Sequence, residues 1–123
     1  MQNKYLEYSK AMIDLAFAEL KTYRKTKSDA HLMEASEKGW NALAQLGAFY
    51  KNKSITHHKE TVMSIKNIPR ENEKEMRTLA ALGESLHANY YNNFFFYESI
   101  KESLETIRTL VNKKLKEEGY SSR

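Results

Sequence analysis

Apolar residues recur every three or four positions over most of this chain, the spacing that places side chains on one face of an α-helix. The first such segment covers residues 4–27. A second begins after Ser28 or Asp29, either of which can cap a helix N-terminus, and it reaches about Lys53. Since the link between them is short, we expect two long helices packed as an antiparallel hairpin. Their expected buried faces comprise Leu6, Ile13, Phe17 and Leu20, then Leu32, Ala35, Gly39, Ala42, Leu43, Leu46 and Tyr50.

Gly39 stands inside the second predicted helix, where a glycine costs about 1 kcal/mol relative to alanine. Its neighbours one turn away on the same side, Ala35 and Ala42, are also small. This pattern predicts a close approach of another backbone at Gly39. We assign that approach to the first helix.

The second half of the chain predicts further helices separated by clear stops. Thr56 can cap a short helix that reaches about Lys66, and Pro69 ends it and begins a longer helix that runs to His87. The last helix carries the most regular apolar stripe of the chain, and Gly119 follows it where a C-terminal cap belongs. The stripe consists of Ile100, Leu104, Ile107, Val111 and Leu115.

These elements predict an all-α fold. The expected architecture is an up-and-down four-helix bundle with a short extra helix between helices two and three. A chain of 123 residues is long enough for one hydrophobic core. We therefore expect residues 1–118 to form a single helical-bundle domain and residues 119–123 to form a flexible C-terminal tail.

Composition limits the possible functions. The content of 41% hydrophobic and 29% charged residues is typical of a globular domain, and the absence of cysteine excludes disulfides and cysteine-ligated metals. No apolar run is long enough for a membrane span or a secretory signal, so we expect a cytoplasmic protein without membrane contact. Nothing in the sequence calls for a cofactor. The net charge of +4 comes partly from clusters at helix ends, where cations complement the helix dipole: Lys21, Arg24, Lys25 and Lys27, then Lys113, Lys114 and Lys116.

The segment from Leu86 to Tyr97 differs from the rest of the chain. It contains six aromatic residues, three asparagines and one histidine within twelve positions. Asparagine competes for backbone hydrogen bonds and favours turns, so we expect a helix to end here. This much aromatic surface must be buried against the bundle, a second subunit or a ligand.

Two segments resemble a known family. Residues 35–42 read ASEKGWNA, which resembles the A-S-E-K-x-W-x-A signature of the archaeal PaREP proteins. Residues 86–91 read LHANYY, which is similar to the L-H-A-N-F-Y segment that leads into the last helix of that family. The family is grouped with the HEPN superfamily of four-helix, often dimeric domains. The resemblance therefore implies an HEPN-like bundle and a homodimer, and many HEPN members are metal-independent ribonucleases or partners in toxin–antitoxin systems.

The resemblance also implies where a ribonuclease site would lie. HEPN ribonucleases carry Arg-x(4–6)-His before their last helix, with the histidine handling the proton of a ribose hydroxyl and the arginine stabilising charge on the phosphate. His87 occupies the place of the histidine, but residues 80–82, where the arginine would stand, are apolar. Arg77 lies one turn too early, and the formal match from Arg24 to His31 falls across an interhelical turn. We expect no catalytic residue of this type.

The candidate site residues have structural alternatives. His87, Asn89, Tyr90 and Lys38 could contact a ligand or RNA. The favoured interpretation of each is structural: His87 at a helix end, Asn89 closing a turn, Tyr90 in packing and Lys38 on the solvated surface. The adjacent pair His57 and His58 forms no metal motif, because neighbouring side chains diverge on a helix, so we expect no metal site. The remaining aromatic residues cannot all face one small core, and we assign them to an interface: Tyr91, Phe94, Phe95, Phe96 and Tyr97.

Three functions remain open. The favoured interpretation is a non-catalytic interaction module that dimerises through its last helix and the segment from Tyr90 to Tyr97. The alternative is a metal-independent ribonuclease, or a nucleotide- or RNA-binding protein of the toxin–antitoxin type, with a site around His87. A third is an antitoxin-like adaptor whose partner is another protein.

Overall fold

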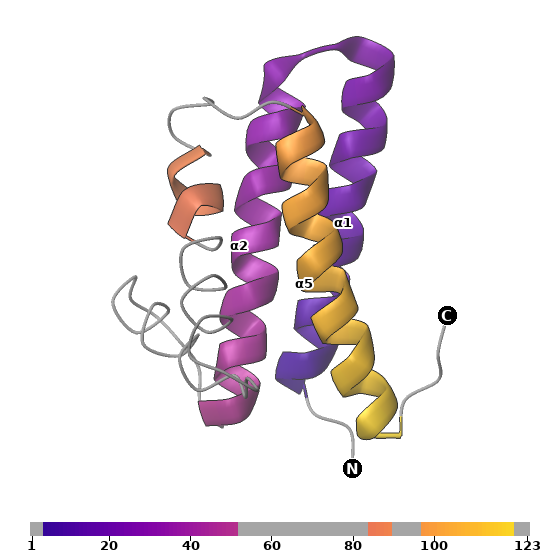
Figure 1. Ribbon diagram of the computed structural model, residues 1–123, viewed down its shortest axis with the longest axis vertical. Helices are drawn as coiled ribbons and strands as arrows, with labels where there is room; N and C mark the ends of the chain where they lie inside the picture. The colour runs from indigo at the N-terminus through magenta and orange to yellow at the C-terminus, as the bar shows by residue number, and fades with distance from the viewer. Residues whose placement is uncertain (1–3, 52–83, 90–96, 120–123) are drawn as a thin grey trace.

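The computed structural model describes residues 4–51, 84–89 and 97–119, and these residues form an all-α bundle without strands. Helix α1 (Lys4–Thr26) and helix α2 (Asp29–Lys51) form an antiparallel hairpin, and helix α5 (Tyr97–Glu117) runs alongside in the direction of α2 (Figure 1). Residues 84–89 form a further helical segment. The short helix predicted at residues 56–66 and most of the predicted third helix lie outside the described residues.

The turn between α1 and α2 is confirmed at the predicted place. It comprises Lys27 and Ser28 only. Lys27 has a positive φ of 59° and its N–H donates to the carbonyl oxygen of Tyr23 at 2.7 Å, which is the left-handed geometry that usually ends a helix. The N–H of His31 donates to the carbonyl oxygen of Ser28 at 3.0 Å, so Ser28 is the residue that begins α2 as its N-cap.

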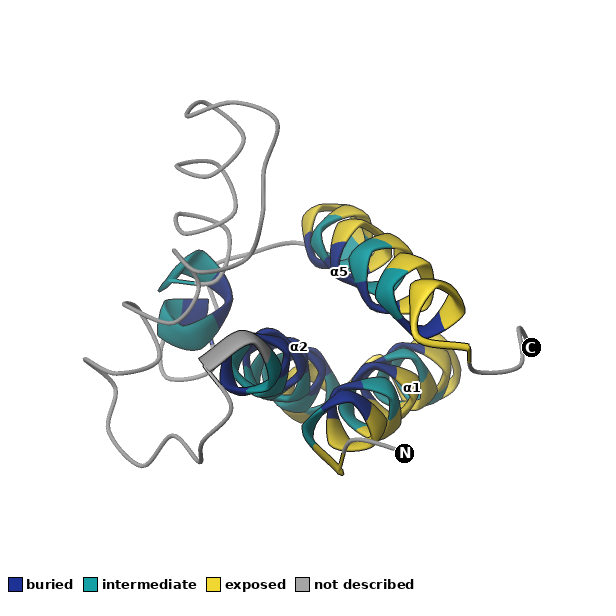
Figure 2. Cartoon of the chain, turned by 90° about the horizontal axis from the view of Figure 1, so that it is seen from below, coloured by how far each residue is buried: buried dark blue, intermediate teal, exposed yellow. Residues whose placement is uncertain are grey.

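The hydrophobic core lies where the inner faces of the three long helices meet (Figure 2). All five residues of the predicted α5 stripe are buried, as are Leu6, Ile13 and Leu20 of α1. Phe17 is only partly buried, because it lies at the seam between α1 and α5 under the guanidinium of Arg108, 3.9 Å from the ring centroid. The ammonium of Lys114 lies 5.4 Å from the ring centroid of Phe49 on α2. Cations of α5 therefore cover aromatic rings on both other long helices.

The prediction that Gly39 allows a close approach of α1 to α2 is wrong. A Cβ atom at Gly39 would collide with Cδ2 of Leu104 on α5 and lie 3.2 Å from Cδ1 of Leu86. The missing side chain therefore makes room for α5 and for residues 84–89. The close contact between α1 and α2 is made elsewhere, where the buried hydroxyl of Ser9 donates to the carbonyl oxygen of Ala42 at 2.6 Å.

The C-terminal end of α5 confirms the predicted cap. Gly119 has a φ of 87° and its N–H donates to the carbonyl oxygen of Lys116 at 3.1 Å. The N–H of Glu118 donates to the carbonyl oxygen of Lys114 at 3.0 Å. A residue with a side chain would be strained in this left-handed conformation, so glycine is suited to end the helix here.

We expect Gly39→Ala to lower the free energy of unfolding by about 1 kcal/mol, because overpacking costs ~1–3 kcal/mol and exceeds the gain of ~1 kcal/mol in helix propensity. In a Leu104→Ala background the obstructing methyl group is gone, and the same substitution should become neutral or stabilising. Urea denaturation of the four proteins measures this coupling. An equal cost of Gly39→Ala in both backgrounds would show that Leu104 does not set the requirement for glycine.

Candidate functional site

The structure places His87 against two residues of α2. Its Nδ1 lies 3.7 Å from Oε2 of Glu37, and its ring packs on Trp40 with the centroids 4.8 Å apart at an interplanar angle of 31°. Glu37 and Trp40 are three residues apart, so they lie on one side of α2 and both face residues 84–89. The segments 35–42 and 86–91, which carry the family resemblance, are therefore in contact at His87.

Glu37 is the residue of this cluster whose pKa departs from its usual value. Its Oε2 is buried without a hydrogen-bond partner in the described residues. Burial raises the pKa of the Glu37 carboxyl above its usual value of 4.5, and the neighbouring carboxylate of Glu34 raises it further, whereas His87 and Lys38 act to lower it. At 3.7 Å the Glu37 carboxyl and the His87 ring are adjacent but beyond hydrogen-bonding distance.

Asn89 has a structural contact that explains its burial. Its side chain is fully buried, and Nδ2 donates to the hydroxyl oxygen of Ser36 at 2.7 Å. That hydroxyl in turn donates to the carbonyl oxygen of Leu32 at 3.0 Å. The chain of hydrogen bonds fastens residues 84–89 to α2, and it thereby positions His87 beside Glu37.

Lys38 is directed to a different partner. Its Nζ lies 3.0 Å from Oε2 of Glu34, one helical turn earlier on α2. Lys38 follows Glu37 directly in the sequence, so their side chains diverge around the helix. Lys38 therefore influences the Glu37 carboxyl by charge.

Of the aromatic residues assigned to an interface, the structure describes Tyr97, whose ring packs against another residue of the same chain. It stacks on the ring of Tyr23 in α1, with centroids 5.7 Å apart at an interplanar angle of 19°. This contact ties the first turn of α5 to the last turns of α1. The other proposed interface residues, and Tyr90 of the proposed ligand site, lie outside the described residues: Tyr91, Phe94, Phe95 and Phe96.

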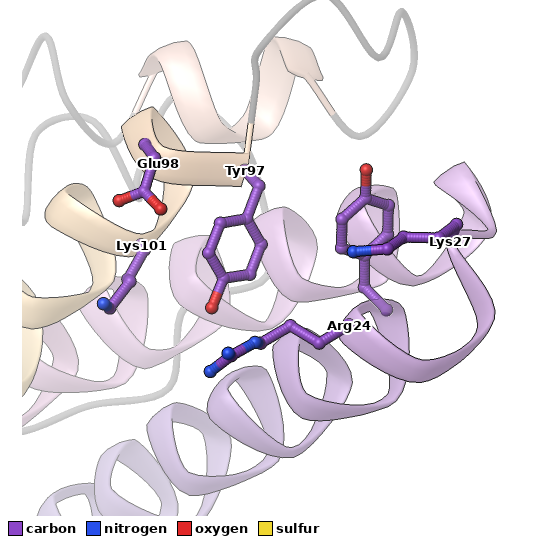
Figure 3. A pocket seen from close by; sticks show the side chains of 6 residues that line it. Arg24, Lys27, Tyr97, Glu98 and Lys101 are labelled. Atoms are coloured by element: carbon purple, nitrogen blue, oxygen red, sulfur yellow. The ribbon is translucent and has the colours of Figure 1, made fainter.

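A cavity of about 520 Å³ opens beside the stacked tyrosines, at the end of the bundle where α1 ends and α5 begins (Figure 3). It is lined by Tyr23, Arg24, Lys27, Tyr97, Glu98 and Lys101. Sequence reasoning assigned Arg24 and Lys27 to the helix dipole and missed this cavity. The sequence feature that points to the cavity is the grouping of Tyr23, Arg24 and Lys27 within five positions. Nothing in the sequence places Tyr97 and Lys101 opposite them.

The described residues contain no metal centre, and residues 80–82, where the arginine of an HEPN ribonuclease site would stand, lie outside them, as does Arg77. The described part of the chain includes no group of three histidine, aspartate or glutamate side chains close enough to hold an ion. The two arginines in this part of the chain are Arg24, at the cavity, and Arg108, over Phe17, and neither acts on the Glu37 carboxyl. No helix within the described ranges is long and apolar enough to cross a bilayer.

Comparison of the chain with models of known protein families, with curated proteins and with solved structures gave no match. The PaREP and HEPN resemblance of the two sequence segments therefore stays a prediction.

The raised pKa of Glu37 predicts a pH dependence of stability. The folded state holds the Glu37 proton to a higher pH than the unfolded chain, so this group lowers the free energy of unfolding as the pH rises from 4.5 through the raised pKa. Glu37→Gln removes this contribution, so the difference in unfolding free energy, wild type minus variant, should fall as the pH rises above the ordinary Glu pKa of 4.5. Urea denaturation of both proteins at several pH values measures this difference. Parallel profiles of the two proteins would contradict the prediction.

Proposed function

We propose that this chain is a non-catalytic, HEPN-like interaction module of the archaeal PaREP type that acts in the cytoplasm as a homodimer. The family part of the proposal rests on the sequence segments 35–42 and 86–91, and the observation that carries the homodimer is an apolar stripe on the outer face of α1. The two large hydrophobic side chains exposed in the described residues, Tyr8 at 53% and Leu15 at 44%, both belong to it. The stripe, called the α1 stripe below, consists of the exposed residues Tyr8, Ala11, Leu15 and Ala18, followed by the half-buried Thr22, whose hydroxyl donates to the carbonyl oxygen of Ala18.

The spacing of the α1 stripe suits a second helix. Its members follow one another at steps of three, four, three and four, the pattern of a seam between two packed helices. Tyr8 and Leu15 project, whereas Ala11 and Ala18 leave room for a side chain of the facing helix. If two copies of α1 pack antiparallel with Leu15 opposite Ala18 of the second copy, a twofold axis makes the reverse contact as well.

Charges beside the α1 stripe favour the same arrangement. Asp14 and Lys21 each precede a stripe residue, so they flank it on one side. In the antiparallel pairing, Asp14 of one copy lies near Lys21 of the second copy, and the twofold axis repeats this pair. Asp14 already pairs with Lys10 at 3.0 Å, but its side chain stays more than half exposed and accessible to a second cation.

The last helix, which the sequence pattern suggested as a partner surface, has a polar outer face along its described length. The exposed residues of α5 are Glu98, Ser99, Glu102, Glu105, Thr106, Thr109, Asn112, Lys113, Lys116 and Glu117. A charged and hydroxyl-rich face of this kind is less suited to a stable homodimer than the α1 stripe. We therefore assign the contact between copies to α1.

We expect Leu15→Glu to convert the dimer to a monomer, because the interface would have to bury a carboxylate without a partner. Asn112→Glu, which adds the same charge to the exposed face of α5, should leave the dimer intact. Sedimentation equilibrium over a dilution series measures both. A charge exchange sharpens the test: Asp14→Lys should weaken the dimer, and adding Lys21→Asp should restore it. A wild-type monomer at high micromolar concentration would overturn the proposal.

The ribonuclease alternative rests on the acid and imidazole pair of Glu37 and His87. It needs a cation to stabilise charge on the phosphate, and Lys38 pairs with Glu34 instead. We expect no cleavage of single-stranded RNA by the wild-type chain in the absence of metal. Cleavage that disappears in His87→Ala, with the helical circular dichroism of the variant unchanged, would establish the alternative and contradict a non-catalytic role.

A further inference from the structure

The cavity at the end of the bundle gathers three cations from two helices. Arg24 and Lys27 come from the end of α1 and its turn, and Lys101 comes from the second turn of α5. None of them forms an ion pair within 4.0 Å with a carboxylate of the described residues. Several positive charges around one hollow raise the local concentration of anions there.

The stacked tyrosines join the two helices that carry these cations. Tyr23 precedes Arg24 directly, and Tyr97 lies one turn before Lys101 on α5, so the stack of the two rings fixes the spacing of the backbones at Arg24 and Lys101. The ammonium of Lys27 lies 5.6 Å from the ring centroid of Tyr23 and is held on that side of the cavity. In Figure 3 the hydroxyl of Tyr97 points toward the side chain of Arg24. A guanidinium and a phenol hydroxyl together offer several hydrogen-bond donors to an oxyanion.

We infer that this cavity binds a small soluble phosphate monoester. The lining carries three positive charges and the one negative charge of Glu98, and the difference of +2 balances a phosphate monoester, which carries a charge of about −2 near neutral pH. Arg24, Lys101 and the Tyr97 hydroxyl hold the phosphate. The volume of about 520 Å³ leaves room for an organic part against the tyrosines, and Glu98 accepts a hydrogen bond from a hydroxyl of that part.

The test uses the full chain, calorimetric titration at constant ionic strength, and two probes, inorganic phosphate and phenyl phosphate. Arg24→Gln and Lys101→Gln should each weaken phenyl phosphate binding about tenfold or more, because each removes a charged hydrogen bond. Lys25→Gln is the matched control, since Lys25 is exposed, adjacent to Arg24 and not part of the lining, and it should change the affinity less than about twofold. Glu98→Gln should tighten phosphate binding.

Several outcomes would overturn the inference. Wild-type protein that binds neither probe at millimolar concentration contradicts it, and so does an equal loss of affinity in Arg24→Gln, Lys101→Gln and Lys25→Gln, which would indicate general attraction of anions. A phosphate diester that binds as tightly as phenyl phosphate contradicts the charge balance. Phosphatidic acid vesicles distinguish a lipid headgroup: binding to them without binding to phenyl phosphate would replace the small soluble ligand by a lipid.

Discussion

Leu104 of α5 lies directly over Gly39 of α2, where the absence of a side chain lets the two helices approach, and Leu86 reaches the same point from residues 84–89. All three residues are buried, so three elements of the bundle meet at one place on α2. Any larger residue at position 39 would have to displace both leucines. The helix cost of a glycine, about 1 kcal/mol, is therefore offset by the packing that it permits.

The position of both candidate sites follows from this contact. On one side of α2, the approach of residues 84–89 brings Asn89 onto Ser36 and His87 onto Glu37. On the α5 side, Tyr97 lies two turns before Leu104, so the register that seats Leu104 on Gly39 also brings Tyr97 to Tyr23. The stack of these rings in turn shapes the cationic cavity.

The chemistry of the bundle differs between its surfaces. The cluster around Glu37 and His87 is partly enclosed, and this burial raises the pKa of the Glu37 carboxyl. The cavity at the bundle end is open and positively charged, which suits binding of an anion. The α1 stripe exposes Tyr8 and Leu15 on the outer face of α1 and suits a second copy of the chain.

Much of this arrangement could be predicted from the sequence, because it depends on neighbours along the chain. The ends of α1, the start of α2, the buried stripe of α5 and the cap at Gly119 follow from helical periodicity and from local capping geometry. The sequence indicated a close approach at Gly39, but the approaching helix was predicted wrongly. Small residues on one helix face do not identify which helix packs against them. The tertiary structure decided the contacts of Asn89 with Ser36, of His87 with Glu37 and of Tyr97 with Tyr23. Each joins residues far apart in sequence, and each depends on the angle and register at which helices pack, which no local pattern of residues contains.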